Sequence, residues 1–187
     1  TDGLLFCLDE HMARMRRSLQ ALRIEYDVDL LAEQIARTVA ANELSDAFVK
    51  AIVSRGAGPA PSLDPRGLTP TSVVFAERPL LLVEEDALRD GLTLKTSALR
   101  RPRPDVLDPK IKSLNYLNNV LARIEANDAG VPEAIMLNQL GNVAEGTVQN
   151  VFIAKSGKVR LVAIGALTIL AVILNTTLRA RARGMKV

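Results

Sequence analysis

The sequence predicts a two-domain protein of mixed α+β and α/β character, and three observations support this. Its 187 residues suffice for one large or two small domains. Hydrophobic residues make up 48% of the chain but aromatic ones only 3%, so Leu, Val, Ile and Ala must build the cores. A segment rich in proline and arginine, residues 100–109, is typical of an interdomain linker. It separates a small α+β domain (1–99) from a larger one (110–187).

Composition and charge exclude several classes of protein. The net charge is +3, with 24 basic residues largely scattered among 21 acidic ones, so charge does not indicate nucleic-acid binding. A single cysteine, Cys7, rules out an intramolecular disulfide, and a single histidine, His11, argues against a Cys/His zinc site. Because Thr1 leads directly into an apolar strand pattern, we expect that the natural N-terminus is missing.

The first domain is expected to begin with a strand over residues 3–8, followed by two amphipathic helices. Asp9 is the predicted N-cap of the first helix, whose apolar residues recur at helical spacing: Met12, Met15, Leu19 and Leu22. Asp29 is the predicted N-cap of the second helix, which carries an apolar face: Leu30, Leu31, Ile35 and Val39. Residues 42–45 should end that helix.

Strands are predicted over residues 47–54, 72–76 and 91–99, with a short helix over 84–89. The first two strands flank residues 55–70, which are rich in glycine and proline and should form a loop. This loop has neither a G-x-G-x-x-G pattern nor a Walker lysine, so it does not indicate a nucleotide site.

The second domain should contain a helix from Ser113 to about Ala126, a strand over 134–137, a polar turn over 138–142 and a strand over 151–153. Lys112 comes directly before this helix. A helix N-terminus disfavours positive charge and so favours the neutral amine that a nucleophilic lysine needs. Lys110 lies two residues earlier, and spacing alone cannot choose between the two lysines.

Residues 161–178 form an 18-residue stretch without charge, followed by three arginines. A membrane span needs about 20 apolar residues. Asparagine, threonine and glycine within the stretch weaken that interpretation. A buried helix with a basic, exposed end is the favoured alternative.

Two motifs resemble those of the class IV aminotransferases, which use pyridoxal 5'-phosphate (PLP). They are IKSLNYLNNVLARIEA, beginning at Ile111, and VAEGTVQNVF, beginning at Val143. This family contains the branched-chain aminotransferases, the D-amino-acid aminotransferases and aminodeoxychorismate lyase. The residues of the two motifs are most similar to those of the branched-chain aminotransferases. The resemblance implies the two-domain class IV fold (fold type IV), with an incomplete C-terminal domain in this chain.

The resemblance also implies roles for the residues of these motifs. The K-S-L-N pattern identifies Lys112 as the lysine that bonds covalently to PLP and acts as its acid and base. Glu145 would pair with the protonated pyridine nitrogen of PLP, which keeps the ring an electron sink. Gly146 and Thr147 would lie against the cofactor. Tyr116 would donate to the phenolic oxygen of PLP or else be a half-buried helix residue.

Arginines are candidates for binding anions, since a guanidinium is always charged and multidentate. His11 and Arg14 match a His-x-x-Arg pattern of the family, in which the arginine holds the PLP phosphate; His11 is interpreted as structural. Arg100 and Arg101 fall in the predicted linker, and active sites often lie at domain interfaces, so either could bind a substrate carboxylate. The alternative for all three arginines is a solvated surface charge.

The pattern breaks down after Lys158. Family members have a Gly-x-Thr-Arg turn that holds the PLP phosphate at a helix N-terminus. Here residues 165–167 and 171–174 resemble the flanks of that turn, and Thr168 is the remaining candidate between them. The chain ends at Val187, before the family's remaining elements, so we expect truncation at this end too.

The implied function is PLP-dependent transamination between a branched-chain amino acid and 2-oxoglutarate by a cytoplasmic homodimer. Within PLP chemistry the alternatives are a D-amino-acid aminotransferase and a lyase. A non-catalytic remnant of the family and a membrane-anchored module are alternatives of other classes.

Overall fold

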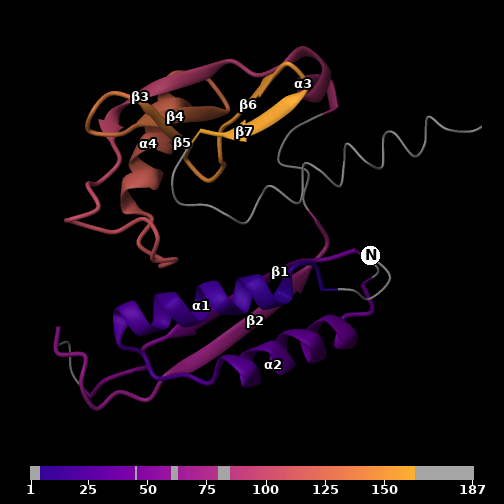
Figure 1. Cartoon of the computed structure of the whole chain (residues 1–187), viewed down its shortest axis with the longest axis vertical. Coiled ribbons are helices and arrows are strands. Elements are labelled where there is room, and N and C mark those ends of the chain that lie inside the picture. The colour runs from indigo at the N-terminus through magenta and orange to yellow at the C-terminus, as the bar shows by residue number, and fades with distance from the viewer. Residues whose placement is uncertain (1–4, 45, 60–62, 80–84, 163–187) are drawn as a thin grey trace, which may run out of the picture. The chain divides into compact units, whose positions relative to one another are not determined.

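The computed structural model describes residues 5–44, 46–59, 63–79 and 85–162 (Figure 1). The chain divides into two units, Thr1–Glu84 and Glu85–Val187. This boundary lies before residue 99, where the sequence predicts the end of the first domain. The reason is that the strand over 94–100 pairs within the second unit. Residues 100–109 therefore connect two elements of the second unit.

Two helices pack against one face of a two-stranded antiparallel sheet in the first unit (Figure 1). Its elements are α1 (Leu8–Leu22), α2 (Val28–Ala41), β1 (Phe48–Ser54) and β2 (Thr71–Glu77). Phe48 lies opposite Glu77 and Ser54 opposite Thr71, so the two strands pair along their whole length. The sequence predicts both helices and both strands within a few residues of these bounds.

The helix starts differ from the predicted ones. Residues 5–7 are not a strand, and residues 1–4 of the chain, which include the start of the predicted strand, lie outside the described part. Cys7, with a left-handed φ of 50°, is the N-cap of α1, so Asp9 lies in the first turn, where negative charge is favoured. Asp27 rather than Asp29 caps α2, because its Oδ1 accepts from two backbone N–H groups of the first turn, at 2.9 and 3.2 Å.

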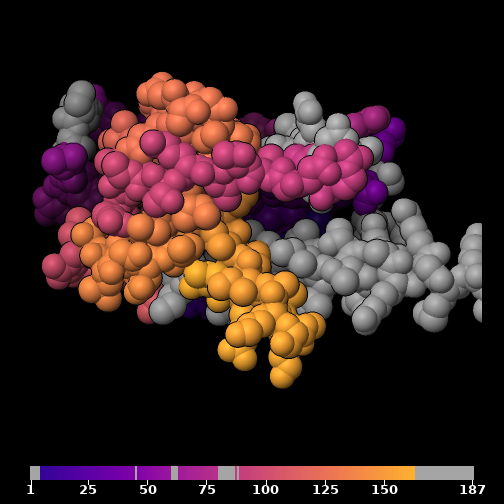
Figure 2. All heavy atoms as spheres, turned by 90° about the horizontal axis from the view of Figure 1, so that it is seen from above, coloured from indigo at the N-terminus to yellow at the C-terminus, as the bar shows by residue number. Residues whose placement is uncertain are grey.

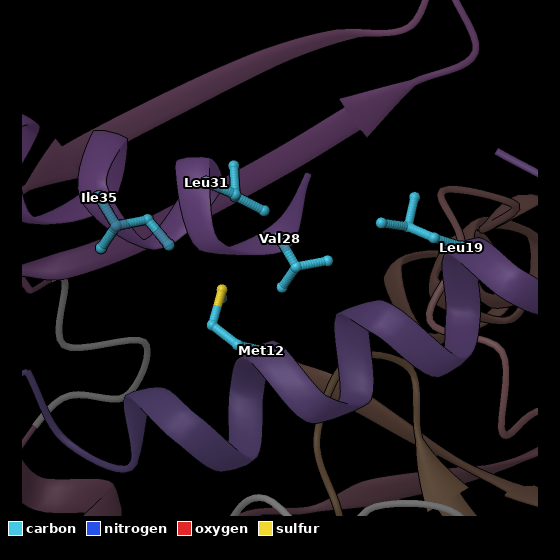
Figure 3. Close-up of a cluster of buried hydrophobic side chains, with 5 residues drawn as sticks. All are labelled: Met12, Leu19, Val28, Leu31 and Ile35. Atoms are coloured by element: carbon cyan, nitrogen blue, oxygen red, sulfur yellow. The ribbon is translucent and has the colours of Figure 1, made fainter. Parts of the chain in front are cut away.

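The core of the first unit lies between its helices and its sheet. Figure 3 shows five buried side chains that gather there: Met12 and Leu19 of α1, and Val28, Leu31 and Ile35 of α2. Three residues of β1, at alternate positions from Val49 to Val53, pack against this cluster. The cluster is aliphatic apart from the Met12 thioether, as the low aromatic content predicts.

The second unit is built around a three-stranded sheet with the order β3-β4-β5. Its elements are α3 (Glu85–Asp90), β3 (Leu94–Arg100), α4 (Leu117–Asp128), β4 (Glu133–Leu137), β5 (Val143–Gly146), β6 (Phe152–Lys155) and β7 (Lys158–Leu161). β3 and β4 are parallel and joined by α4, which packs on both strands, while β5 returns antiparallel to β4. In this βαβ arrangement, the segment that connects β3 to α4 lies at the end of the sheet where β3 finishes.

Three elements of the second unit differ from prediction: the helix α4 and the strands β5 and β7, of which β7 is also not predicted. α4 begins at Leu117 instead of Ser113, because the Ser113 hydroxyl accepts the backbone N–H of Asn115 at 3.3 Å and so holds a turn instead of a helix. β5 is a strand that the sequence does not predict. It is only four residues long and contains a glutamate and a glycine, so it lacks apolar alternation.

β6 and β7 form a hairpin whose side chains are mostly exposed. In Figure 2 the yellow-orange atoms of this hairpin project from the surface of the molecule. Among the described residues, no helix is long and apolar enough to cross a membrane. Most of the uncharged stretch 161–178 lies outside the described residues, so the structure says nothing about it.

Candidate functional site

Lys112 lies in the turns before α4 and is exposed. Asp108 shapes this segment by accepting the backbone N–H of Lys110 at its carboxylate, at 2.9 Å, and that of Ile111 at its carbonyl, at 3.1 Å. Lys112 Nζ donates to the hydroxyl of Tyr116 at 3.0 Å and lies 5.7 Å from the ring centroid. An accessible amine therefore stands beside a phenol, just before the first turn of α4.

Glu145 on β5 forms an ion pair with Arg101, the residue that follows β3. Arg101 Nε lies 2.6 Å from Glu145 Oε1, and the two side chains are 20% and 29% exposed. β3 and β5 flank β4 in the sheet, so this ion pair spans the central strand. From the sequence, Arg101 is a candidate ligand for a substrate carboxylate, and in the structure its guanidinium contacts a carboxylate of the protein itself.

Two asparagines in the first turn of α4 hold the same guanidinium. Arg101 Nη1 donates to Asn118 Oδ1 at 3.1 Å and to Asn119 Oδ1 at 2.8 Å. Asn119 is 8% exposed, and its amide Nδ2 donates to the carbonyl of Thr147 at 2.7 Å. Asn119 therefore connects α4 with Arg101 and with the residue two positions after Glu145.

Thr147 is fixed through both of its backbone polar groups. Glu133 Oε1 accepts its N–H at 3.0 Å and also accepts the N–H of Ala134 at 2.7 Å. Arg123 Nη1 lies 3.3 Å from Glu133 Oε2 and compensates the charge of this nearly buried carboxylate. Within the part of the chain that the structure describes, the buried hydroxyl of Thr147 has no hydrogen-bond partner. Buried hydroxyls are normally satisfied, so this one is a candidate for binding a ligand.

Gly146 lies against the turn that follows β5. A Cβ at this position would meet the backbone oxygen of Gln149 at 3.3 Å and its Oε1 at 3.4 Å. The Gly146 N–H also donates to that backbone oxygen at 2.7 Å. The turn after β5 therefore occupies the space next to Gly146.

The remaining candidate residues lie elsewhere. Arg14 is on α1 in the first unit, partly buried, where its carbonyl accepts the Ser18 hydroxyl at 3.1 Å. Partial burial, followed by the positive charge of Arg14, lowers the pKa of His11 below its ordinary value of 6.5, although Glu10 opposes this. Arg100 is exposed at the end of β3. Residues 165–168 lie outside the described part of the chain.

Sequence reasoning misses Asn118, Asn119 and Glu133 as parts of the site. Their contacts with Arg101 and Thr147 join residues 14 to 28 positions apart, and no local motif indicates such contacts. Across residues 5–44, 46–59, 63–79 and 85–162, no group of His, Cys, Asp or Glu could hold a metal ion. The described residues of the site carry an amine, a phenol, a carboxylate, a guanidinium, and hydroxyl and amide groups.

The sequence model described as "Amino-transferase class IV" matches residues 1–187, which is the entire chain. The chain belongs to the class IV aminotransferase family. A protein of Methanocaldococcus jannaschii assigned as a branched-chain-amino-acid aminotransferase is 43% identical over 162 residues, covering 83% of this chain and 54% of that protein. A D-alanine aminotransferase of Bacillus licheniformis is 33% identical over 156 residues, covering 82% of this chain and 53% of that protein.

Solved structures support the class IV aminotransferase fold. The branched-chain amino acid aminotransferase of Thermobaculum terrenum, in its PLP form, is similar with a TM-score of 0.73 and 28% identity. The similarity covers 89% of this chain and 56% of that one. This class IV aminotransferase chain thus spans about half the length of the curated relatives that it matches.

Proposed function

We propose that this chain supplies the PLP-bonding part of an aminotransferase that moves an amino group between a branched-chain amino acid and 2-oxoglutarate. The observation that carries the proposal is the arrangement around the first turn of α4. Lys112 and Tyr116 contact one another just before this turn. Glu145 is held at the same turn through Arg101 and its two asparagines.

The residues present fit PLP. Lys112 offers an exposed amine for the covalent bond to the cofactor's aldehyde carbon. Glu145 is partly exposed and its Oε1 faces Arg101, while no hydrogen bond to its Oε2 is seen among the described residues. That second oxygen can accept the proton of the pyridine nitrogen. The unpartnered hydroxyl of Thr147 suits an oxygen of the cofactor.

Each residue has a distinct task in this proposal. PLP, when bound, supplies the electron sink for the negative charge that develops at the substrate Cα. Lys112 Nζ would take the proton from the substrate Cα and deliver it to the C4′ atom of the cofactor. Tyr116, at 3.0 Å from Nζ, orients the amine and donates to the phenolic oxygen of the cofactor. Arg14 stays a candidate for the phosphate on its sequence pattern alone.

The substrate class rests on the relatives. The M. jannaschii protein supports branched-chain amino acids, and the B. licheniformis enzyme supports D-alanine as the second candidate. We favour the branched-chain reaction because the first of these relatives is more similar to the chain. A homodimer located in the cytoplasm is part of the same proposal.

Absorbance spectroscopy with borohydride reduction tests the cofactor site. The purified protein with PLP should show a band in the near-ultraviolet or visible region, and borohydride should fix the cofactor to a peptide containing Lys112. Lys112→Ala should lose the label. Lys110→Ala, which changes the neighbouring lysine of the same loop, should keep it.

Two results would contradict the proposal. A folded protein that takes up no PLP would favour a non-catalytic remnant of the family, and a label on Lys110 would show that the motif is misaligned. If the label is on Lys112, a panel of L-branched-chain amino acids and D-alanine as amino donors decides between the two reactions.

A further inference from the structure

Arg101 is held more firmly than an ordinary surface arginine. Its backbone N–H donates to the carbonyl of Leu137 at 2.9 Å, and its carbonyl accepts from Gln139 Nε2, also at 2.9 Å. Both ends of the residue are thus anchored to β4 and to the turn that follows it. The side chain leaves this anchor in a fixed direction, with only 20% of it exposed.

The guanidinium of Arg101 divides its donors between two elements. Nε faces Glu145 Oε1 on β5 at 2.6 Å, while Nη1 donates to Asn118 and Asn119 on α4. A planar guanidinium with donors on both sides suits this arrangement, and a lysine ammonium could not reproduce it. Arg101 therefore connects the helix turn next to Lys112 with the carboxylate on β5.

The carboxylate has its own constraint from the residue that follows Gly146. The Thr147 carbonyl accepts from Asn119 and its N–H donates to Glu133, so the backbone after Glu145 cannot shift freely. With the backbone fixed, the ion pair with Arg101 determines which way the carboxylate faces. Oε1 is occupied by Arg101, which leaves Oε2 for a ligand.

We propose that Arg101 is a positioning residue that orients Glu145 toward the ring nitrogen of PLP, with Asn119 as its support, and that it does not bind the substrate carboxylate. This inference rests on the proposed function, since it takes PLP as the ligand of Glu145. It assigns a task to Arg101 that differs from the substrate-binding role expected from the sequence. It also gives a task to the two asparagines in the first turn of α4 whose side-chain oxygens accept from Arg101.

The test compares PLP with 1-deazapyridoxal phosphate, an analogue in which carbon replaces the ring nitrogen. Only PLP can bond to Glu145 through that nitrogen. The unmodified protein should bind PLP more tightly than the analogue, by about tenfold, as expected for a charge-assisted hydrogen bond. Arg101→Lys should bring the ratio of the two dissociation constants close to one, while binding of the analogue changes little.

Arg103→Lys is the matched control. Arg103 lies two residues further along and forms an exposed ion pair with Asp105 at 2.7 Å, so its substitution should leave the ratio unchanged. Asn119→Ala is a second variant, and it should reduce the ratio partly because it removes one of the two asparagines that hold Arg101. The urea unfolding midpoint of each variant establishes that it is folded.

The possible outcomes separate this inference from the proposed function. A protein that binds neither compound overturns both. An unmodified protein that binds both equally refutes the pairing of Glu145 with the ring nitrogen, and the role of Arg101 with it. If the unmodified protein discriminates and Arg101→Lys keeps the same ratio while the KM for the amino acid rises, then Arg101 binds substrate and only this inference fails.

Discussion

Glu125 shows how a single exposed carboxylate can join two elements. It lies on α4, and its Oε2 accepts the backbone N–H of Ala98 on β3 at 2.9 Å. This bond, then a hydrogen bond from the Ser97 side chain and the charge of Lys95, lowers the pKa of Glu125 below its ordinary value of 4.5. The ionised form is therefore the one that links the helix to the strand.

The pH dependence of stability should follow from this shift. Because the pKa of Glu125 is lower in the folded state, its contribution is fully present above about pH 4.5 and is lost as the pH falls through the folded-state pKa. Glu125→Gln should therefore have a lower free energy of unfolding than the unmodified protein at pH 6, and this difference should shrink toward pH 3. Urea unfolding across this range measures the difference, and a carboxyl of Glu125 that titrates at 4.5 by NMR would contradict the assignment.

At the level of single residues, the sequence suggests candidates for the chemistry but does not reveal their contacts. A local motif is enough to single out Lys112 and Glu145, because both are in short segments with a characteristic order of residues. Arg101 can be found as an arginine near the site, but its partner Glu145 is 44 residues away, so the sequence cannot show that the two meet. Asn119 resembles any polar residue on a helix until its two partners are seen.

The helices and strands follow from hydrophobic periodicity where they are long, and less well where they are short. α1 and α2 carry apolar residues at helical spacing and are predicted with starts that each miss by two residues. The cap of α2 is mistaken because Asp27 and Asp29 are the same residue type two positions apart, and only the geometry identifies the acceptor. β5, with four residues, is too short for a periodic signal.

The packing of α2 provides a test at this scale. Leu31 is fully buried between α1 and the sheet, whereas Leu30, next to it on α2, is 44% exposed. Leu31→Ala should lower the free energy of unfolding of the first unit by about 2–5 kcal/mol, since it removes buried apolar contacts and leaves a cavity. Leu30→Ala is the control and should cost less than about 1 kcal/mol. Equal losses in urea unfolding would show that α2 is rotated relative to the arrangement in Figure 3.

At the scale of the whole molecule, the sequence predicts a first domain that ends at residue 99, whereas the chain divides into two units after Glu84. Prolines and arginines after β3 suggest a linker, yet β3 pairs in parallel with β4, a strand that begins 33 residues after the end of β3. Pairing between distant strands cannot be read from local composition. The glycines and prolines of residues 55–70 are, by contrast, correctly interpreted as a loop.

Each unit has buried groups of its own, and this predicts where destabilisation will spread. Leu31 belongs to the core of the first unit, and Glu133 is the carboxylate that accepts two backbone N–H groups in the second. Glu133→Ala should cost about 2–4 kcal/mol, because it leaves those two N–H groups without an acceptor. Glu133→Gln keeps an acceptor oxygen and should cost less.

Hydrogen exchange measured by mass spectrometry can locate these losses. Leu31→Ala should speed amide exchange in α1, α2, β1 and β2 by about 30-fold or more for a loss of 2 kcal/mol, and leave α4 and β4 unchanged. Glu133→Ala should do the reverse. If either substitution speeds exchange equally in both units, the chain unfolds as one cooperative body. In that case the proposed cofactor site on β5 and α4 would share its stability with the helices of the first unit, and Leu31→Ala would weaken the proposed binding of PLP as well.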